Sequence, residues 1–291
     1  MSLVLLIIGF CFGEYVIFDL HCHTHCSDGA LSPGELVLRA KEKGVAVLSI
    51  TDHDTIAGLQ LAEATASEVD LKLIPGIEFS SQWMGSSVHI VGLNLRVESP
   101  ELQEAIEIQT QSREQRSIQI SEKLHKLGIE DALVGTREIA GSASIARPHF
   151  AQYLIAKGHA KDMNAAFKKY LGQGKPADVK YQWPEIQQVV GWIKAAGGVA
   201  VLAHPVKYDL TRTRLCKMIA EFVEVGGDAM EVISGHQPPN ITQDLARLAN
   251  KFDLYASCGS DFHQPNQPWQ ELGQFGQLPD NVKPVWQLMG F

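Results

Sequence analysis

The chain has 291 residues, and its 45% hydrophobic content is enough for a large core, built as one big domain or as one domain with an insertion. The formal net charge of −8 argues against a protein that coats nucleic acid through a generally positive surface. The five cysteines have no regular spacing, which argues against a disulfide-stabilised secreted protein and favours the reducing cytoplasm.

The chain begins with an apolar run from Leu3 to Phe12. This run is too short to cross a bilayer as a helix, and we expect no membrane contact. It has no positive region before it and no clear cleavage site after it, as a secretory signal would require. We interpret residues 1–14 as an apolar extension. It is either a vector-derived or mis-started addition, or an additional segment that packs on the protein. A signal peptide is the alternative.

Residues 15–97 alternate apolar strands with helices. Ser32, Pro33 and Glu35 form a capping box with proline at the first helical position, so a helix begins there and ends before Gly44. We predict strands at Tyr15–Phe18, Val45–Ile50, Leu71–Ile77 and Ser87–Leu95, and a second helix at about Ile56–Glu68.

The pattern changes over residues 98–183. Ser99-Pro100-Glu101 begins a long helix that extends to about Leu127, and three shorter helical pieces follow to about Leu171. No strand pattern is present in this part of the sequence. We therefore predict an all-helical insertion domain, residues 98–183, that caps the substrate.

Alternation resumes from residue 184 to the C-terminus. We predict strands at Val199–Ala203, Ala229–Ile233 and Leu254–Cys258, with helices at about 184–196, 211–225 and 240–250. Seven strands, most of them followed by a helix, indicate an α/β protein with a parallel sheet, closed or open. The two alternating segments, 15–97 and 184–291, would form one barrel domain.

Histidines and carboxylates gather near the C-terminal ends of these strands. His21 and His23 are two apart on a strand and project to one face. In a closed β/α barrel the C-terminal strand ends share one face, so these side chains would converge. The candidate metal ligands are His21, His23, Asp28, His53, Glu78, His89, His204, Asp261 and His263.

Two of these residues also have simpler interpretations: His89 alone is compatible with a satisfied strand histidine, and His204 with a strand cap. Glu231, which is not among the nine, is interpreted as structural. One ion with an open position needs only three or four protein ligands, so the whole set suggests two or three divalent ions. Mixed histidine and carboxylate ligands suit manganese, iron or zinc.

Six motifs together resemble the PHP (polymerase and histidinol phosphatase) family. They are Asp19-Leu20-His21-Cys22-His23, Ser27-Asp28-Gly29, Thr51-Asp52-His53-Asp54, Gly76-Ile77-Glu78, Ala203-His204-Pro205 and Ser260-Asp261-Phe262-His263. The resemblance implies a distorted seven-stranded (β/α)7 TIM-like barrel whose trinuclear metal centre hydrolyses phosphoesters. The insertion with Arg147-Pro148-His149 resembles the nucleoside 3′,5′-bisphosphate phosphatase branch, which includes ribonuclease AM.

The resemblance also implies a division of the ligands among three ions. His21, His23, Glu78 and Asp261 would hold one ion; Glu78 and His89, with His204 or His149, a second; and Asp28, His53 and His263 a third. We favour His204, because it follows a barrel strand, and leave the choice open. Manganese is the favoured metal, with iron or zinc as alternatives. A hydroxide bridging the ions would attack phosphorus, and His204 or His149 would protonate the leaving oxygen.

Charge is unevenly divided between the two predicted domains. Residues 96–183 carry a net charge of +2 and the remainder −10, which add to the total of −8. Arg113 and Arg116 are three apart and share a helix face. With Arg147 and His149 they would bind a second phosphate, although a solvated helix face is the alternative.

So few phosphate contacts suit a nucleotide bisphosphate or a short single-stranded RNA trimmed from its 5′ end, not duplex DNA. Two other functions remain open: a histidinol-phosphate phosphatase, and a non-catalytic PHP module that only binds metal. The sequence does not specify the oligomeric state.

Overall fold

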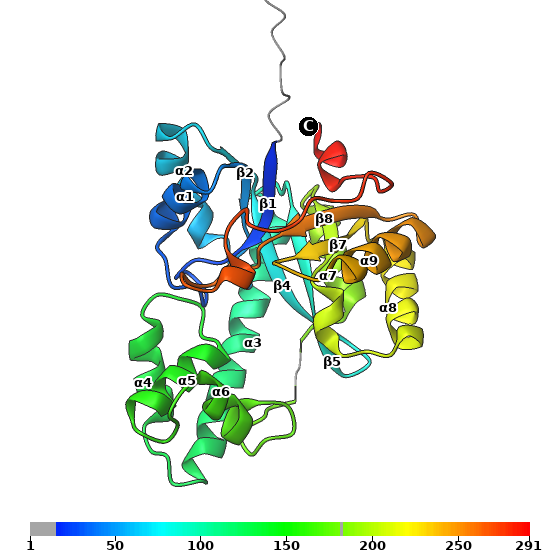
Figure 1. Ribbon diagram of the computed structural model, residues 1–291. Helices are drawn as coiled ribbons and strands as arrows, with labels where there is room; N and C mark the ends of the chain where they lie inside the picture. The colour runs from blue at the N-terminus through cyan, green and yellow to red at the C-terminus, as the bar shows by residue number, and fades with distance from the viewer. Residues whose placement is uncertain (1–15, 181–182) are drawn as a thin grey trace, which may run out of the picture.

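The computed structural model describes residues 16–180 and 183–291 (Figure 1). The predicted N-terminal extension, residues 1–14, lies outside this range. No helix in the described ranges is long and apolar enough to cross a bilayer.

Eight strands form two sheets within the described residues. The first sheet has the order β1-β2-β3 and is parallel, and the second has the order β4-β5-β6-β7-β8. The strands are β1 (Ile17–Cys22), β2 (Val45–Ile50), β3 (Lys72–Leu73), β4 (Gly76–Trp83), β5 (Ser86–Leu93), β6 (Val199–Leu202), β7 (Ala229–Ser234) and β8 (Tyr255–Gly259). The prediction of an α/β fold is confirmed.

Two details of the predicted sheet were wrong. The single strand expected over Leu71–Ile77 is divided into β3 and β4, and β5 runs antiparallel to both β4 and β6. Met84 and Gly85 connect β4 to β5 with φ of 47° and 75°. Two successive positive φ angles are typical of a tight hairpin turn, so the chain reverses there instead of crossing over through a helix. Methionine is unusual at such a turn, and the sequence did not reveal it.

The resemblance implied one closed barrel. Among the described strands, however, the hydrogen-bonded ladder does not close on itself, and it is divided into two sheets. Two isolated parallel bridges connect the sheets, one between Cys22 and Phe262 and one between His53 and Glu78. Backbone hydrogen bonds of 2.8 Å from Asp261 N to the His21 carbonyl and 2.9 Å from His23 N to the Phe262 carbonyl also join β1 to the end of β8.

Helices cover both sheets. Leu36, Val37 and Ala62 lie in the buried cluster that α1 and α2 form with β2, and a second, larger cluster joins β4–β8 to α7, α8 and α9. These helices are α1 (Pro33–Glu42), α2 (Ala57–Glu68), α7 (Ile186–Ala195), α8 (Arg212–Glu224) and α9 (Pro239–Lys251), with short 3-10 turns at η2 (Pro205–Tyr208), η3 (Pro268–Gln270) and η4 (Val285–Met289). The predicted capping box at Ser32 and Glu35 is confirmed.

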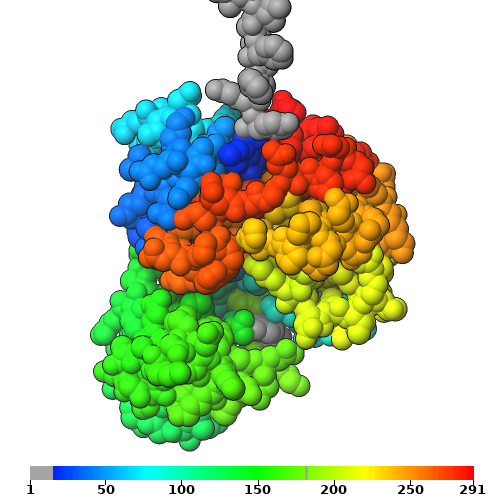
Figure 2. Space-filling view, viewed as in Figure 1, coloured from blue at the N-terminus to red at the C-terminus, as the bar shows by residue number. Residues whose placement is uncertain are grey.

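The segment between β5 and α7 is helical and forms a separate lobe (Figure 1). Its helices are α3 (Pro100–His125), α4 (Ala132–Ala140), α5 (Arg147–Ala156) and α6 (Met163–Ala166), followed by the π-helical turn η1 (Phe167–Leu171). It has its own buried cluster, which includes Leu124, Phe150 and Leu171. Figure 2 shows a hollow between this helical lobe and the rest of the molecule.

Candidate metal centre and adjoining arginine pocket

Most of the nine candidate ligands lie at strand ends or in the loops that follow, but the prediction of a C-terminal strand end was wrong for two of them: Glu78 is the third residue of β4, and His89 lies in the middle of β5. Three lie within strands, His21 in β1, Glu78 in β4 and His89 in β5, and His204 follows β6. The others follow β1, β2 and β8: His23, Asp28, His53, Asp261 and His263. Glu78 and His21 are completely buried, so their polar side chains need partners inside the protein.

Glu78 lies at the centre of the cluster. Five imidazoles place a ring nitrogen within 3.3 Å of its carboxylate oxygens: His21, His23, His53, His89 and His204. Oε1 is 2.9 Å from His89 Nδ1 and 3.0 Å from His204 Nε2. One carboxylate in contact with this many imidazoles has the position of a ligand shared between ions.

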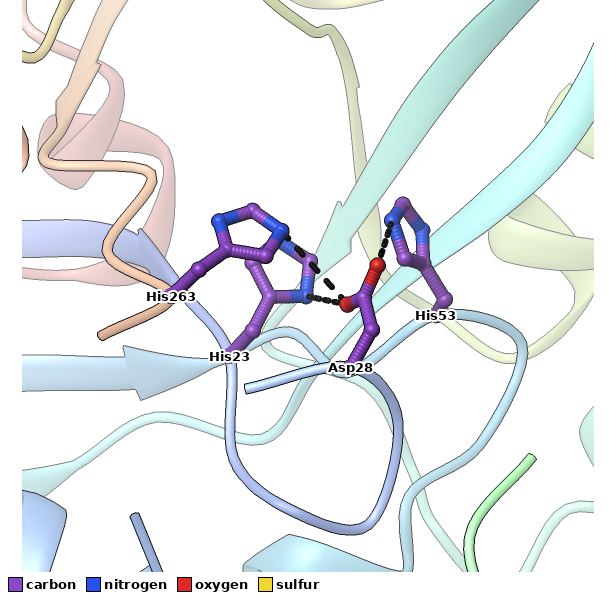
Figure 3. Close-up of side chains that lie close together, drawn as sticks. All are labelled: His23, Asp28, His53 and His263. Atoms are coloured by element: carbon purple, nitrogen blue, oxygen red, sulfur yellow. Dashed lines mark ion pairs between the residues drawn. The ribbon is translucent and has the colours of Figure 1, made fainter. Parts of the chain in front are cut away.

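Asp28 forms a second centre, shown in Figure 3. His263 Nε2, His53 Nε2 and His23 Nδ1 lie 3.5, 3.8 and 3.9 Å from its carboxylate oxygens. The loop that carries Asp28 is tight at Gly29, where a Cβ atom would lie 2.4 Å from the His23 carbonyl oxygen. Glycine is therefore required for the turn that returns Asp28 to the histidines.

Asp261 completes a third group with the two histidines of β1. Its Oδ1 is 3.5 Å from His21 Nε2 and 3.3 Å from His23 Nε2. Within the described part of the chain, four groups have ligand atoms within 4.8 Å of one another: His23, Asp28, His53 and His263; His21, Glu78 and His204; His21, His23 and Asp261; and His53, Glu78 and His89. His23 thus joins the Asp28 group as well as the Asp261 group, which the predicted division did not include.

The electrostatics of the cluster favour ionised carboxylates. Burial alone would raise the pKa of Asp28, Glu78 and Asp261, but neighbouring positive charge holds each pKa well below its usual value. For Asp261 that charge comes first from Lys207 and then from His21. Burial lowers the pKa of His23 to about 3. Ionised carboxylates beside a neutral imidazole are the forms that bind metal.

The donor set fits divalent ions on its own geometry. Within the described residues, the buried atoms His23 Nδ1, Asp28 Oδ1 and Glu78 Oε2 have no hydrogen-bond partner. A buried polar atom without a partner costs about 1–3 kcal/mol, and ions bound at the Asp28 group and at the Glu78 groups would supply partners for these three atoms. The candidate donors are imidazole nitrogens and carboxylate oxygens, without thiolates. Such donors are typical of a catalytic Mn, Fe or Zn site and not of a structural zinc site.

Two residues outside the nine candidate ligands contact this cluster. Lys207, on η2, forms an ion pair with Asp261. Glu231, interpreted from the sequence as structural, is 2% exposed and lies 2.5 Å from His21 Nδ1. A glutamate inside an otherwise apolar strand is the sequence signal that could have identified it.

A small cavity joins the candidate ligands to the helical lobe. It has a volume of about 70 Å³. Its lining includes three candidate ligands, Asp28, His53 and His89, and all three predicted arginines, Arg113, Arg116 and Arg147. Ser80, Ser87 and Trp183 complete most of the wall.

Arg113 is bound to the protein more firmly than the sequence suggested. Its Nε donates to Asp54 Oδ2 at 2.7 Å, Nη2 donates to Ser80 Oγ at 3.1 Å, and Nη1 donates to the Ile145 carbonyl at 3.2 Å. The guanidinium carbons of Arg113 and Arg116 also lie 5.5 and 5.6 Å from the Trp183 ring centroid.

His149 and His204 occupy different surroundings. His204 Nε2 lies 3.0 Å from Glu78, whereas His149 joins none of the candidate metal groups found among the described residues. His149 Nδ1 instead accepts a hydrogen bond from Ala146 N at 3.0 Å. Burial lowers the pKa of His149, although nearby Asp28 opposes that shift. The choice of His204 over His149 stays a prediction that this geometry favours.

One parallel and one mixed sheet surrounded by helices, with a cluster of buried histidines and carboxylates, are typical of a metal-dependent α/β hydrolase. The PHP domain model matches residues 19–198, and this chain belongs to the PHP family. A 5′-3′ exoribonuclease of Haemophilus influenzae is 46% identical over 93% of this chain and 98% of its own length. A 3′,5′-nucleoside bisphosphate phosphatase of Chromobacterium violaceum is 39% identical over 92% of this chain and 95% of its own.

The same fold is found in a solved structure. A protein described as an amidohydrolase from Chromobacterium violaceum, with bound sulfate and no metal, superimposes with a TM-score of 0.87. It is 38% identical, and the match covers 94% of this chain and 96% of that chain. The resemblance to the PHP family predicted from the motifs is confirmed.

Proposed function

We propose that this chain is a metal-dependent phosphoester hydrolase that acts on nucleoside 3′,5′-bisphosphates and on the 5′ ends of short RNA. One observation carries the proposal: three candidate metal ligands and three arginines line a single cavity. A substrate with two phosphates matches this arrangement, because one phosphate can lie at the ligands and the other at the arginines. The two relatives act on RNA and on nucleoside bisphosphates, which supports the same substrate class.

The chain's residues have separate roles in this proposal. When bound, two or three divalent ions would neutralise charge on the phosphoryl group and supply an activated water at neutral pH. Glu78, Asp28 and Asp261, with the histidines around them, would hold those ions. We favour manganese and keep iron and zinc as alternatives, since this donor set suits all three.

Arg116 and Arg147 would orient the distant phosphate, and Arg113 would contribute to the same wall. Fixing the far end of the substrate places the reacting phosphoryl group and lowers the entropy cost of reaction. His204 would act as a ligand through Nε2, and His149 would shape the pocket beside Ala146. Proton donation to the leaving oxygen by either histidine stays a prediction.

We also propose that the two sheets act together as one distorted barrel, with residues 98–183 as a capping domain. The bridges from Cys22 to Phe262 and from His53 to Glu78 support the first part. The separate buried cluster of the helical lobe supports the second.

The experiment compares Arg147→Ala with Arg137→Ala, an exposed arginine of the same lobe that pairs with Glu114. Both variants, loaded with Mn²⁺, receive adenosine 3′,5′-bisphosphate, a 5′-phosphorylated oligoribonucleotide and histidinol phosphate. Loss of a charged hydrogen bond of about 1.5–3 kcal/mol predicts that Arg147→Ala raises KM for the nucleotide substrates by about 10- to 100-fold. Arg137→Ala should change it by less than twofold.

Metal content per chain should stay the same in both variants. Preferential hydrolysis of histidinol phosphate by the unaltered protein would overturn the substrate proposal. Loss of bound metal in Arg147→Ala would overturn the division of roles.

A further inference from the structure

A buried carboxylate outside the nine candidate ligands contacts two of them at once. Glu231 lies in the middle of β7, and its two oxygens have different partners. Oε1 accepts a hydrogen bond from His21 Nδ1 at 2.5 Å, and Oε2 accepts one from His204 N at 2.6 Å. A single side chain thereby connects the ends of β1 and β6 beneath the candidate metal centre.

The contact with His21 determines which ring nitrogen faces the cluster. Because Nδ1 donates its proton to Glu231, Nε2 is the atom directed at the other ligands, 3.3 Å from Glu78 and 3.5 Å from Asp261. A histidine that binds metal through one nitrogen commonly donates a hydrogen bond from the other, which fixes the tautomer and the ring orientation.

The contact with His204 acts on the backbone. His204 has φ of 25° and ψ of 58°, a conformation that a residue with a side chain adopts only when its surroundings enforce it. Its N–H is held by Glu231 at the point where β6 ends, and the side chain then reaches Glu78. Without this acceptor, the backbone of His204 would lose the bond that holds its unusual conformation.

We propose that Glu231 is a positioning residue that sets His21 and His204 together for metal binding. Glu231 itself touches no substrate. Three other buried carboxylates lie near the centre, but their hydrogen bonds go to different groups. Asp19 accepts from the backbone of Ser260 and Gly273, Asp52 accepts from Thr24 and Ser27, and Asp54 accepts from Ser80 and Arg113. Asp19 also accepts from the backbone of His21. Among the described residues, none of these three carboxylates has a hydrogen bond to the side chain of a candidate ligand, so they serve as comparisons.

The proposal rests on the proposed metal ligands but not on the proposed substrate, and its test uses metal alone. Glu231→Gln keeps the shape of the side chain but presents one acceptor and one donor to two N–H groups. We expect Mn²⁺ titration of the metal-free protein, followed by calorimetry, to show one class of ions bound about 10- to 100-fold more weakly. The ion held by the Asp28 group should bind as before. Excess Mn²⁺ should restore kcat.

Asp19→Asn is the matched comparison, because it also removes a buried carboxylate next to β1. It should weaken Mn²⁺ binding by less than threefold. An equal loss in both variants would overturn the proposal, since the effect would then come from lost negative charge. Unchanged affinity and stoichiometry in Glu231→Gln would also overturn it. If turnover of every nucleotide fails while this metal difference is found, the proposed function fails and the role of Glu231 stands.

A measurement on the unaltered protein keeps the test decisive if Glu231→Gln does not fold. In zinc-loaded protein labelled with ¹⁵N-histidine, His21 should bind the ion through Nε2 and carry a proton on Nδ1. That proton should resonate far downfield, because its acceptor is a buried carboxylate. Binding through Nδ1, or an ordinary shift for the Nδ1 proton, would overturn the proposal.

Discussion

The buried ion pair between Asp54 and Arg113 connects the segment after β2 to the helical lobe, and it offers a quantitative test. Asp54 follows β2, and Arg113 lies in the middle of α3. The Asp54 side chain is fully buried and that of Arg113 is 7% exposed. Asp54 Oδ1 also accepts a hydrogen bond of 2.7 Å from Ser80 N. Loss of this carboxylate would leave a buried guanidinium without its counter-charge.

Asp54→Asn is the appropriate change, because Asp54 has φ of 55° and asparagine tolerates this left-handed conformation. Removing one partner of a buried pair costs about 3–5 kcal/mol. Since the asparagine oxygen can still accept one bond, we expect a loss near the lower end, about 3 kcal/mol, in the free energy of unfolding. Urea unfolding of the metal-free protein, followed by circular dichroism, measures it.

A double-mutant cycle isolates the pair. Arg113→Met and the double variant complete the cycle, and we expect a coupling energy of about 1–3 kcal/mol. Glu130→Gln is the control, because its ion pair with His125 is exposed on both sides and should contribute under about 0.5 kcal/mol. Additivity of Asp54→Asn and Arg113→Met within about 0.5 kcal/mol would refute the reasoning.

Three further predictions concern the metal centre and the C-terminal segment. Removal of metal with a chelator should lower the melting temperature and Mn²⁺ should restore it, since an ion at 100 times its Kd stabilises by about 2.7 kcal/mol. Metal analysis should find two to three ions per chain, and one ion would contradict the shared role of Glu78. Glu78→Gln should lower the metal content by at least one ion and kcat by more than about 100-fold, because five imidazoles surround that carboxylate; full metal content would disprove it. Burial would raise the pKa of Glu271, but Arg39 holds this pKa below its usual value. The pair therefore stabilises the protein at pH values above the pKa that Glu271 has in the unfolded chain. This stabilisation is lost as the pH falls through the pKa that Glu271 has in the folded protein. Glu271→Gln should therefore cost about 1 kcal/mol at pH 7 and almost nothing near pH 3, and a constant difference across that range in thermal unfolding would argue against the pair.

The sequence by itself determined the local structure and the chemical class of the site. The capping box at Ser32, the run of strands and helices, and the long helix that begins after Ser99 follow from periodicity and capping residues, which act over a few positions. The gathering of histidines and carboxylates was largely accessible, because the ends of parallel strands meet at one face. His23 and Asp28 could be recognised from the sequence for this reason. Glu78 and His89 are the exceptions, since they lie within β4 and β5 and not at C-terminal strand ends.

Only the tertiary structure decided how these groups pair. The reversal at Met84 and Gly85 depends on backbone angles that the sequence does not signal, and it makes β5 antiparallel. The pairing of Arg113 with Asp54 spans 59 positions and that of Glu231 with His21 spans 210. Such contacts arise because packing leaves a buried polar group no solvent and only a specific partner. Spacing along the chain therefore predicts which residues reach the site, and packing decides what each of them touches.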